Sequence, residues 1–228
     1  MPQRVARASR TSNAAVLVLG LGLLGLALTG CAGLSSVIGI DPVTSTTVPD
    51  DGALAFNSEF TDMGSVHPTI VLADQLELEL DMWTEQKTRD WSPDSEKLFS
   101  FVISVYDRSV SADASFESKR HVYMSNIAVT STIESATAAS SSAYDLNADP
   151  VMLTLDPEAL QSDQGLLITS PKGGFQLESE RIGSLPADAT GITLDFAMTI
   201  ATESVAGSAA YSSETVHQLI PVAIFPRE

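Results

Sequence analysis

Apolar and acidic residues alternate with a period of two between Leu76 and Met82. Leucine or methionine occupies every second position, and Glu77, Glu79 and Asp81 fill the positions between them. Successive side chains of a β-strand point to opposite faces with this same period, so one face can meet a core while the other meets water. A helix would distribute the same leucines around its axis. The segment therefore predicts an amphipathic β-strand.

The same period recurs along the rest of the chain. Apolar rows at Phe99–Val105 and Leu194–Ile200 predict two more strands, and shorter strands are predicted at 151–155, 166–169 and 175–178. Beyond the N-terminal leader, no segment has a convincing helical period. The sequence therefore predicts an all-β fold, an immunoglobulin-like β-sandwich.

A weak internal repeat bears on the number of domains. When the chain is shifted by 95 residues, Phe99–Val129 aligns with Leu194–Ile224 without a gap and with six identical pairs. In both copies the apolar step changes from two to three, at 124–127 and at 219–222. Such a change within a strand predicts a bulge or a break. The shared irregularity favours two related β units in tandem.

The domain organisation has two interpretations. If the repeat is real, residues 54–130 and 145–228 form two sandwich units that are joined by a Ser/Ala-rich linker, 131–144. Otherwise the stretch 131–144 is a surface loop of a single larger sandwich with roughly 8 to 12 strands. The sequence alone leaves both interpretations open.

Residues 1–30 have the layers of an export signal. Arg4, Arg7 and Arg10 provide a basic start, and Ala14–Leu28 is a run of 15 residues without a charge. This run is shorter than the roughly 20 residues that span hydrocarbon stably. We therefore expect a cleaved signal segment and not a membrane-spanning anchor.

The leader ends in Leu28-Thr29-Gly30-Cys31, which resembles the lipobox of bacterial lipoproteins. The resemblance implies that the chain is cleaved before Cys31 and that the thiol of Cys31 is acylated. A lipid-modified Cys31 would hold the protein on the extracytoplasmic face of the cell membrane without a spanning helix. The following residues, 31–53, are rich in Ser, Thr, Gly and Pro and predict a flexible tether.

Acidic residues dominate the part of the chain that would remain after cleavage. The whole chain has a formal net charge of −17, and the leader holds three arginines and no acid. Cleavage would leave 9 basic and 29 acidic side chains, a net charge of −20. This charge has the wrong sign for neutralising phosphates, so we expect no nucleic-acid partner.

The best candidate for a metal site lies between residues 145 and 156. Asp145, Asn147 and Asp149 stand on alternate positions, and Asp156 follows at the twelfth. This spacing of oxygen ligands resembles the start of an EF-hand loop and makes Ca²⁺ the one cofactor worth considering. However, Pro150 stands where that loop needs glycine, and a polar loop entering a strand explains the same residues.

Trp83 and Trp91 are the candidate partner-binding residues. They flank the polar segment 84–90, where an exposed indole ring could stack on a sugar or anchor a protein partner. A tryptophan beside a strand also commonly fills a core, and we expect this role for Trp83.

Catalytic signatures are absent from the sequence. It lacks a Gly-x-Ser-x-Gly elbow, a His-Glu-x-x-His helix and a phosphate-binding loop, and no spacing singles out a Ser-His-Asp group. We therefore expect a non-catalytic binding or accessory module of the bacterial cell envelope, with a protein partner. The alternatives are a lipoprotein that captures carbohydrate or Ca²⁺, and an enzyme with a dispersed active site.

Overall fold

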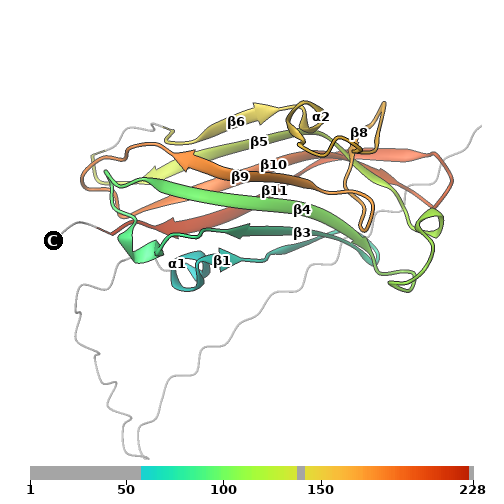
Figure 1. Ribbon diagram of the computed structural model, residues 1–228, viewed down its shortest axis with the longest axis horizontal. Coiled ribbons are helices and arrows are strands. Elements are labelled where there is room, and N and C mark those ends of the chain that lie inside the picture. Colours follow the sequence, from blue (N-terminus) through green and yellow to red (C-terminus); the bar gives the residue numbers. More distant parts are fainter. Residues whose placement is uncertain (1–57, 138–141, 226–228) are drawn as a thin grey trace, which may run out of the picture. The chain divides into compact units, whose positions relative to one another are not determined.

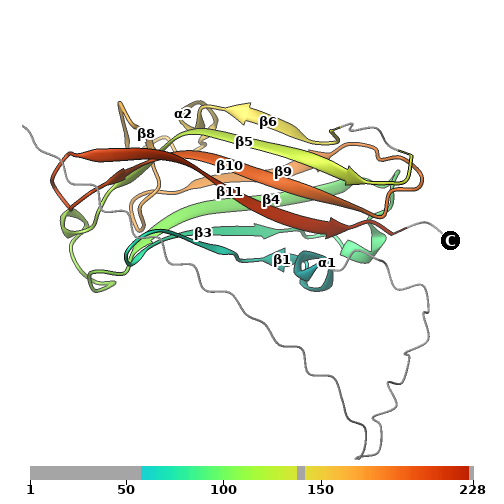
Figure 2. The ribbon, with the colours of Figure 1, turned by 180° about the vertical axis from the view of Figure 1, so that it is seen from behind.

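Two antiparallel β-sheets pack face to face in the computed structural model, which describes residues 58–137 and 142–225. In Figure 1 the sheet that contains β3, β4 and β9 lies in front of the sheet that contains β5, β10 and β11. Figure 2 shows the molecule from behind, with the second sheet nearer to the viewer. The predictions of an all-β fold and of a β-sandwich are confirmed, whereas the immunoglobulin-like subtype stays a prediction.

Sheet A has five strands in the order β1-β3-β4-β9, and β2 pairs with β3 on the same side as β1. Its strands are β1 (Ser65–Val66), β2 (Thr69–Ala73), β3 (Leu76–Trp83), β4 (Lys97–Asp107) and β9 (Phe175–Ile182). Two of the three long apolar rows predicted from the sequence, Leu76–Met82 and Phe99–Val105, lie in β3 and β4.

Sheet B has six strands in the order β11-β10-β5-β8-β7, and β6 also pairs with β5. Its strands are β5 (Val122–Glu134), β6 (Asp145–Ala148), β7 (Gln161–Ser162), β8 (Gly165–Leu167), β10 (Gly191–Glu203) and β11 (Tyr211–Ala223). The third predicted row lies in β10.

Short helices connect the strands. They are α1 (Glu59–Met63), α2 (Pro150–Leu153) and two 3-10 turns, Thr88–Asp90 and Phe116–Ser118. Helix α2 replaces the strand that the sequence predicts at 151–155. Asp149 caps it by accepting the N–H of Val151, and Pro150 occupies its first turn, which are two signals for the start of a helix.

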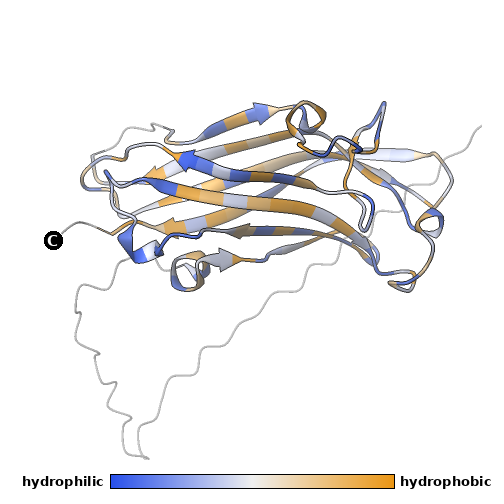
Figure 3. Ribbon diagram, viewed as in Figure 1, coloured by the Kyte–Doolittle hydropathy of each residue, from blue (hydrophilic) through white to orange (hydrophobic). Residues whose placement is uncertain are grey.

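The core lies between the sheets and follows from the alternation. Leu76, Leu78 and Leu80 point inward from β3 and are fully buried. The rings of Phe101 on β4 and Phe196 on β10 meet edge to face with their centroids 5.1 Å apart, so the two sheets interlock at the centre. Figure 3 shows the resulting alternation of hydrophobic and hydrophilic residues along the strands.

Strands from both predicted units lie in one sheet. Strand β5, which begins in the range 54–130 and ends at Glu134, pairs with β10, from the range 145–228, between Gly191 and Thr202. The stretch 131–144 begins within β5 and leads to β6, and these two strands pair with each other. The described strands of both ranges therefore share two sheets and contribute to one core.

The two copies of the repeat occupy different places in this sandwich. The bulge predicted at 124–127 is confirmed, because Asn126 pairs with Thr199 while Met124 pairs with Ile200. The second predicted irregularity, at 219–222, is wrong, since β11 keeps an unbroken register with β10. Moreover, β4 and β5 lie in different sheets, whereas β10 and β11 are neighbours in one sheet.

One side of the sandwich is bridged by the chain that follows β8. The N–H of Val105 on β4 donates to Ile168 O at 2.8 Å, and the N–H of Ile168 donates to Val122 O on β5 at 2.9 Å. Thr169 adds a link, because its Oγ1 accepts the Val122 N–H at 2.8 Å. The segment after β8 is thus hydrogen-bonded to both sheets, which fixes the loop that continues into β9.

The predicted signal segment 1–30, Cys31 and the predicted tether 31–53 lie outside the described residues. Within residues 58–137 and 142–225, no helix has the length and apolar character needed to cross a membrane.

Candidate functional site

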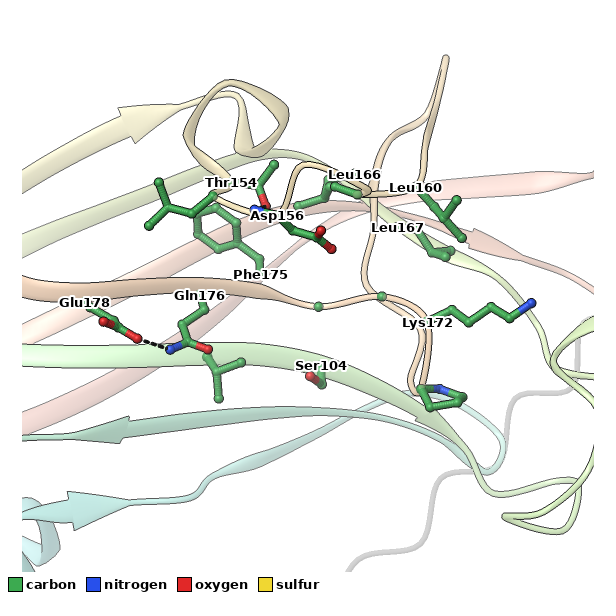
Figure 4. A pocket seen from close by; sticks show the side chains of 16 residues that line it. Ser104, Thr154, Asp156, Leu160, Leu166, Leu167, Lys172, Phe175, Gln176 and Glu178 are labelled. Carbon is green, nitrogen blue, oxygen red and sulfur yellow. Dashed lines mark hydrogen bonds between the residues drawn. The ribbon is translucent and has the colours of Figure 1, made fainter.

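A groove of about 510 Å³ runs over the start of β9, and we call it the β9 groove (Figure 4). Figure 4 shows Thr154 and Asp156 on one side of the β9 backbone, with Ser104, Gln176 and Glu178 on the other. The groove is lined by Val102, Ser104, Thr154, Leu155, Asp156, Ala159, Leu160, Leu166, Leu167, Pro171, Lys172, Gly173, Gly174, Phe175, Gln176 and Glu178. It therefore joins the outer face of sheet A to the loop between α2 and β7.

A tight turn before β9 shapes one end of this groove. The N–H of Gly173 donates to Thr169 O at 2.8 Å, and that of Gly174 donates to Leu167 O at 3.2 Å. A Cβ atom on Gly173 would lie 2.5 Å from Leu167 O, closer than any side chain tolerates. Glycine at position 173 thus lets the turn approach the backbone of β8 closely.

Large apolar side chains stand exposed beside the groove. Leu155 and Leu160 line it and are 85% and 46% exposed, and Met152, on α2 and two positions before the lining residue Thr154, is 79% exposed. These three residues lie within nine positions of one another, whereas single exposed apolar residues are normal on any surface. A cluster of this kind beside a groove marks a candidate binding surface. We call Met152, Leu155 and Leu160 the apolar rim.

Several polar groups of the β9 groove have partners within the protein. The Nε2 group of Gln176 donates to Glu178 at 2.6 Å, and Asp156 accepts the backbone N–H of Glu158 at 2.9 Å. The Lys172 ammonium lies 3.8 Å from a carboxylate oxygen of Glu117. These polar side chains are therefore already engaged within the protein.

A second groove, of about 500 Å³, begins at Trp83, and we call it the Trp83 groove. It is lined by Trp83, Thr84, Glu85, Gln86, Leu98, Ser100, Glu178 and Ser179. Trp83 is half-buried, and it follows the inward-pointing Met82, so its ring belongs to the outer face of sheet A. Because Glu178 lines both grooves, they meet on that face.

The two tryptophans exchange the roles that the sequence suggests. Trp91, not Trp83, fills the core, since it is 1% exposed and its ring packs against Phe60 at 5.5 Å. Its Nε1 group donates to Gln86 at 3.1 Å. Trp91 is therefore buried and is not the exposed indole that the sequence suggests, whereas Trp83 stays a candidate partner-binding residue.

The candidate calcium ligands have separate structural tasks. Asp145 and Asn147 lie on β6, where Asn147 accepts from the side chain of Asn126 at 3.0 Å. Asp149 caps α2, and Asp156 caps the turn that follows it. In the described part of the chain, no group of three or more His, Cys, Asp or Glu residues is placed to hold a metal ion. The geometry thus brings no calcium cluster together.

A Ser-His-Asp chain does occur on the outer face of sheet A. Nδ1 of His67 lies 2.7 Å from Asp81 Oδ1, and Nε2 of His67 lies 3.2 Å from Ser65 Oγ. The pairing of β1 with β3 produces it, because Ser65 and His67 share a face and Asp81 lies across from them. The connectivity is that of a serine-hydrolase triad. However, the side chains of His67 and Asp81 are 62% and 38% exposed, which weakens electrostatic catalysis.

No family model matches this chain, and neither the curated proteins nor the solved structures contain a match.

Proposed function

We propose that this chain is a lipid-anchored β-sandwich on the extracytoplasmic face of a bacterial cell membrane, where it binds a protein partner without catalysis. Acylated Cys31 would be the anchor and residues 31–53 the tether. The partner would dock on the outer face of sheet A, along the β9 groove and the Trp83 groove.

The apolar rim is the observation that carries this proposal. An exposed leucine pair beside a groove is unfavourable in water, and covering it with a partner would remove apolar surface at about 25 cal/mol per Å². The meeting of the two grooves at Glu178 lengthens the surface from Leu160 to Trp83. A surface of this length suits an extended segment of a partner, with apolar side chains for the rim.

The acidic side chains of the two grooves favour some kinds of partner segment over others. Glu85, Asp156 and Glu178 line the two grooves, while the one lysine, Lys172, faces Glu117. The rest of the chain is also strongly acidic. A neutral or basic segment would therefore approach this face more readily than an acidic one.

The first test replaces the apolar rim. The combined variant Met152→Ser, Leu155→Ser and Leu160→Ser should recover about tenfold less partner than wild type in co-purification from native membranes, because truncated anchor residues weaken binding. All three side chains are exposed, so the stability of the fold should change little.

A matched control separates binding from general surface polarity. Val71, on β2, is 71% exposed and lies outside both grooves. The Val71→Ser variant should recover the partner as wild type does. If the rim variant recovers as much partner as Val71→Ser does, docking at the β9 groove is contradicted.

A hydrolase is the second candidate, favoured by the Ser65–His67–Asp81 chain. If Ser65 is a nucleophile and His67 its base, His67→Ala should lower kcat/KM for a simple activated ester by about 10²-fold. The matched control is His217→Ala, which removes a histidine paired with Asp195 at 3.0 Å on the other sheet. The main proposal expects equal, background turnover from wild type and both variants.

A further inference from the structure

Edge strands of the two sheets differ in how well they are protected against pairing. In sheet A, Pro68 stands between β1 and β2, and β9 carries a positive φ at Ser179 and an irregular register. In sheet B, β6 and β7 have only four and two residues. Such interruptions keep an edge from adding a strand. Strand β11 differs, because it runs for 13 residues with an unbroken register.

The backbone of β11 shows which groups face away from β10. At the C-terminal end, Ile224 N–H donates to Thr190 O on the β10 side at 3.0 Å, while Ala223 N–H donates to Thr61 Oγ1 of α1 at 2.9 Å. Since the direction alternates along a strand, odd-numbered residues present N–H and C=O to the open side. Pro221, which has no N–H, fits this parity.

The N-terminal half of the outer edge of β11 is open within the described residues. Helix α1 covers only the C-terminal end of β11, through Thr61. The outward N–H groups of Ser213, Thr215 and His217 have no hydrogen-bond partner within the described ranges. Backbone groups of this kind readily accept another strand.

Charge favours a second copy of this chain as that strand. In a protein of net charge −17, the segment from Tyr211 to Leu219 carries one formal charge, Glu214, and no lysine or arginine. Repulsion between two copies is therefore smaller at this edge than elsewhere on the acidic surface.

The residues of the edge also complement themselves about Thr215. In an antiparallel pair centred there, Tyr211 would lie opposite Leu219 of the second copy, which is 57% exposed. Glu214 would lie opposite Val216, so like charges would not face each other directly. Such self-complementarity is what a twofold interface requires.

We propose that β11 pairs with β11 of a second copy, antiparallel and centred on Thr215, so that the two copies of sheet B form one continuous sheet. The inference does not depend on the grooves or on the anchor, because it uses only β11 and its neighbours.

Disulfide crosslinking tests the register. Across the proposed centre, the two Thr215 Cα atoms would lie about 5.5 Å apart, within disulfide range. Thr199 is the matched control, because it neighbours Thr215 on β10 and is hydrogen-bonded to it. Its two copies would lie about 14 Å apart, three strand spacings, which is too far for a disulfide. Full-length Thr215→Cys should therefore crosslink in detergent well beyond wild type, which keeps Cys31, and Thr199→Cys should not.

Sedimentation of the full chain tests the association itself. Wild type should show a dimer fraction that rises with concentration. Thr215→Lys adds a charge to the edge, and Thr215→Pro removes an outward N–H without touching the backbone hydrogen bonds to β10. Each should weaken dimerisation by about tenfold or more.

Several results would overturn the proposal. These are a wild type that stays monomeric at every concentration, equal crosslinking of Thr215→Cys and Thr199→Cys, and dimers of unchanged strength in both Thr215 variants. Binding of a different protein along β11, with the chain itself monomeric, would also refute pairing between copies.

Discussion

Replacing Asp107 by alanine is expected to lower the free energy of unfolding by about 3 to 5 kcal/mol, because it removes the carboxylate that pairs with the largely buried guanidinium of Arg120. The Asp107 side chain is 1% exposed and that of Arg120 is 13% exposed. Nη2 and Nε of Arg120 donate to the two carboxylate oxygens at 2.8 and 3.0 Å. The pair is thus buried and bidentate, the geometry in which removing one partner costs most.

The position of this pair explains why its loss should affect the whole fold. Asp107 ends β4 in sheet A, and Arg120 lies just before β5 in sheet B. The carboxylate also accepts the backbone N–H of Arg120 at 2.9 Å and that of Ser109 at 3.1 Å. It therefore fixes both ends of the connection between the sheets.

Chemical denaturation of wild type and Asp107→Ala measures this effect. The matched control is Asp195→Ala, which removes an aspartate that is 36% exposed and pairs with His217. An exposed pair contributes little, so this control should lose no more than about 1 kcal/mol. A loss for Asp107→Ala as small as that of the control would show that the buried pair does not stabilise the fold.

The same pair sets a dependence on pH. Burial by itself would raise the pKa of Asp107, but the hydrogen bonds from Arg120 and Ser109 outweigh it and hold this pKa far below its usual range. A carboxyl with a lowered pKa stabilises the folded state above its unfolded pKa of about 3.9, and this contribution declines as pH falls below that value. The stability gap between wild type and Asp107→Asn should therefore narrow in acid below about pH 4.

Local alternation explains how much of the fold could be predicted. The rows in β3, β4 and β10 depend only on which residues must be buried on one side of a strand, and this information is local. The helix α2 was predictable as well, since Asp149-Pro150 is a helix-start signal. The short apolar run after Pro150 obscured it.

Contacts between distant segments explain what could not be predicted. The β9 groove depends on the hydrogen bonds of Val105 and Val122 to residues near 168, and no local pattern encodes them. Leu160 is likewise placed by a contact with β8, because the N–H of Leu167 donates to Leu160 O at 2.8 Å.

The position of one tryptophan could be predicted from local sequence, and that of the other could not. Trp83 could be assigned to the outer face from the parity of β3, because every even position from Leu76 to Met82 points inward. Trp91 lies in a loop without such a period, and its burial depends on Phe60, which is 31 positions away in the sequence. The parity of β3 thus predicts that Trp83 lies on the outer face, and only the tertiary structure reveals the burial of Trp91.

Replacing Cys31 by alanine is expected to move nearly all of the protein from the membrane fraction to the soluble fraction. Two acyl chains bind a bilayer stably because each buried methylene contributes about 0.8 kcal/mol, and alanine has no thiol to acylate. The chain beyond the leader would carry a net charge of −20, so anionic headgroups would repel it. The substitution therefore removes the proposed attachment while leaving a body that has no electrostatic attraction to the bilayer.

Fractionation after a high-salt wash measures this release, since salt weakens retention through a charged partner. Ser36→Ala, five positions further along the predicted tether, is the matched control and should stay with the membrane. Labelling with a radioactive fatty acid should mark wild type and Ser36→Ala but not Cys31→Ala. If Cys31→Ala stays with the washed membranes as wild type does, the lipid anchor is refuted. If it is released but still binds the partner through the apolar rim, then anchoring and binding are separate properties of the chain, as the distance in sequence between Cys31 and Met152 leads us to expect.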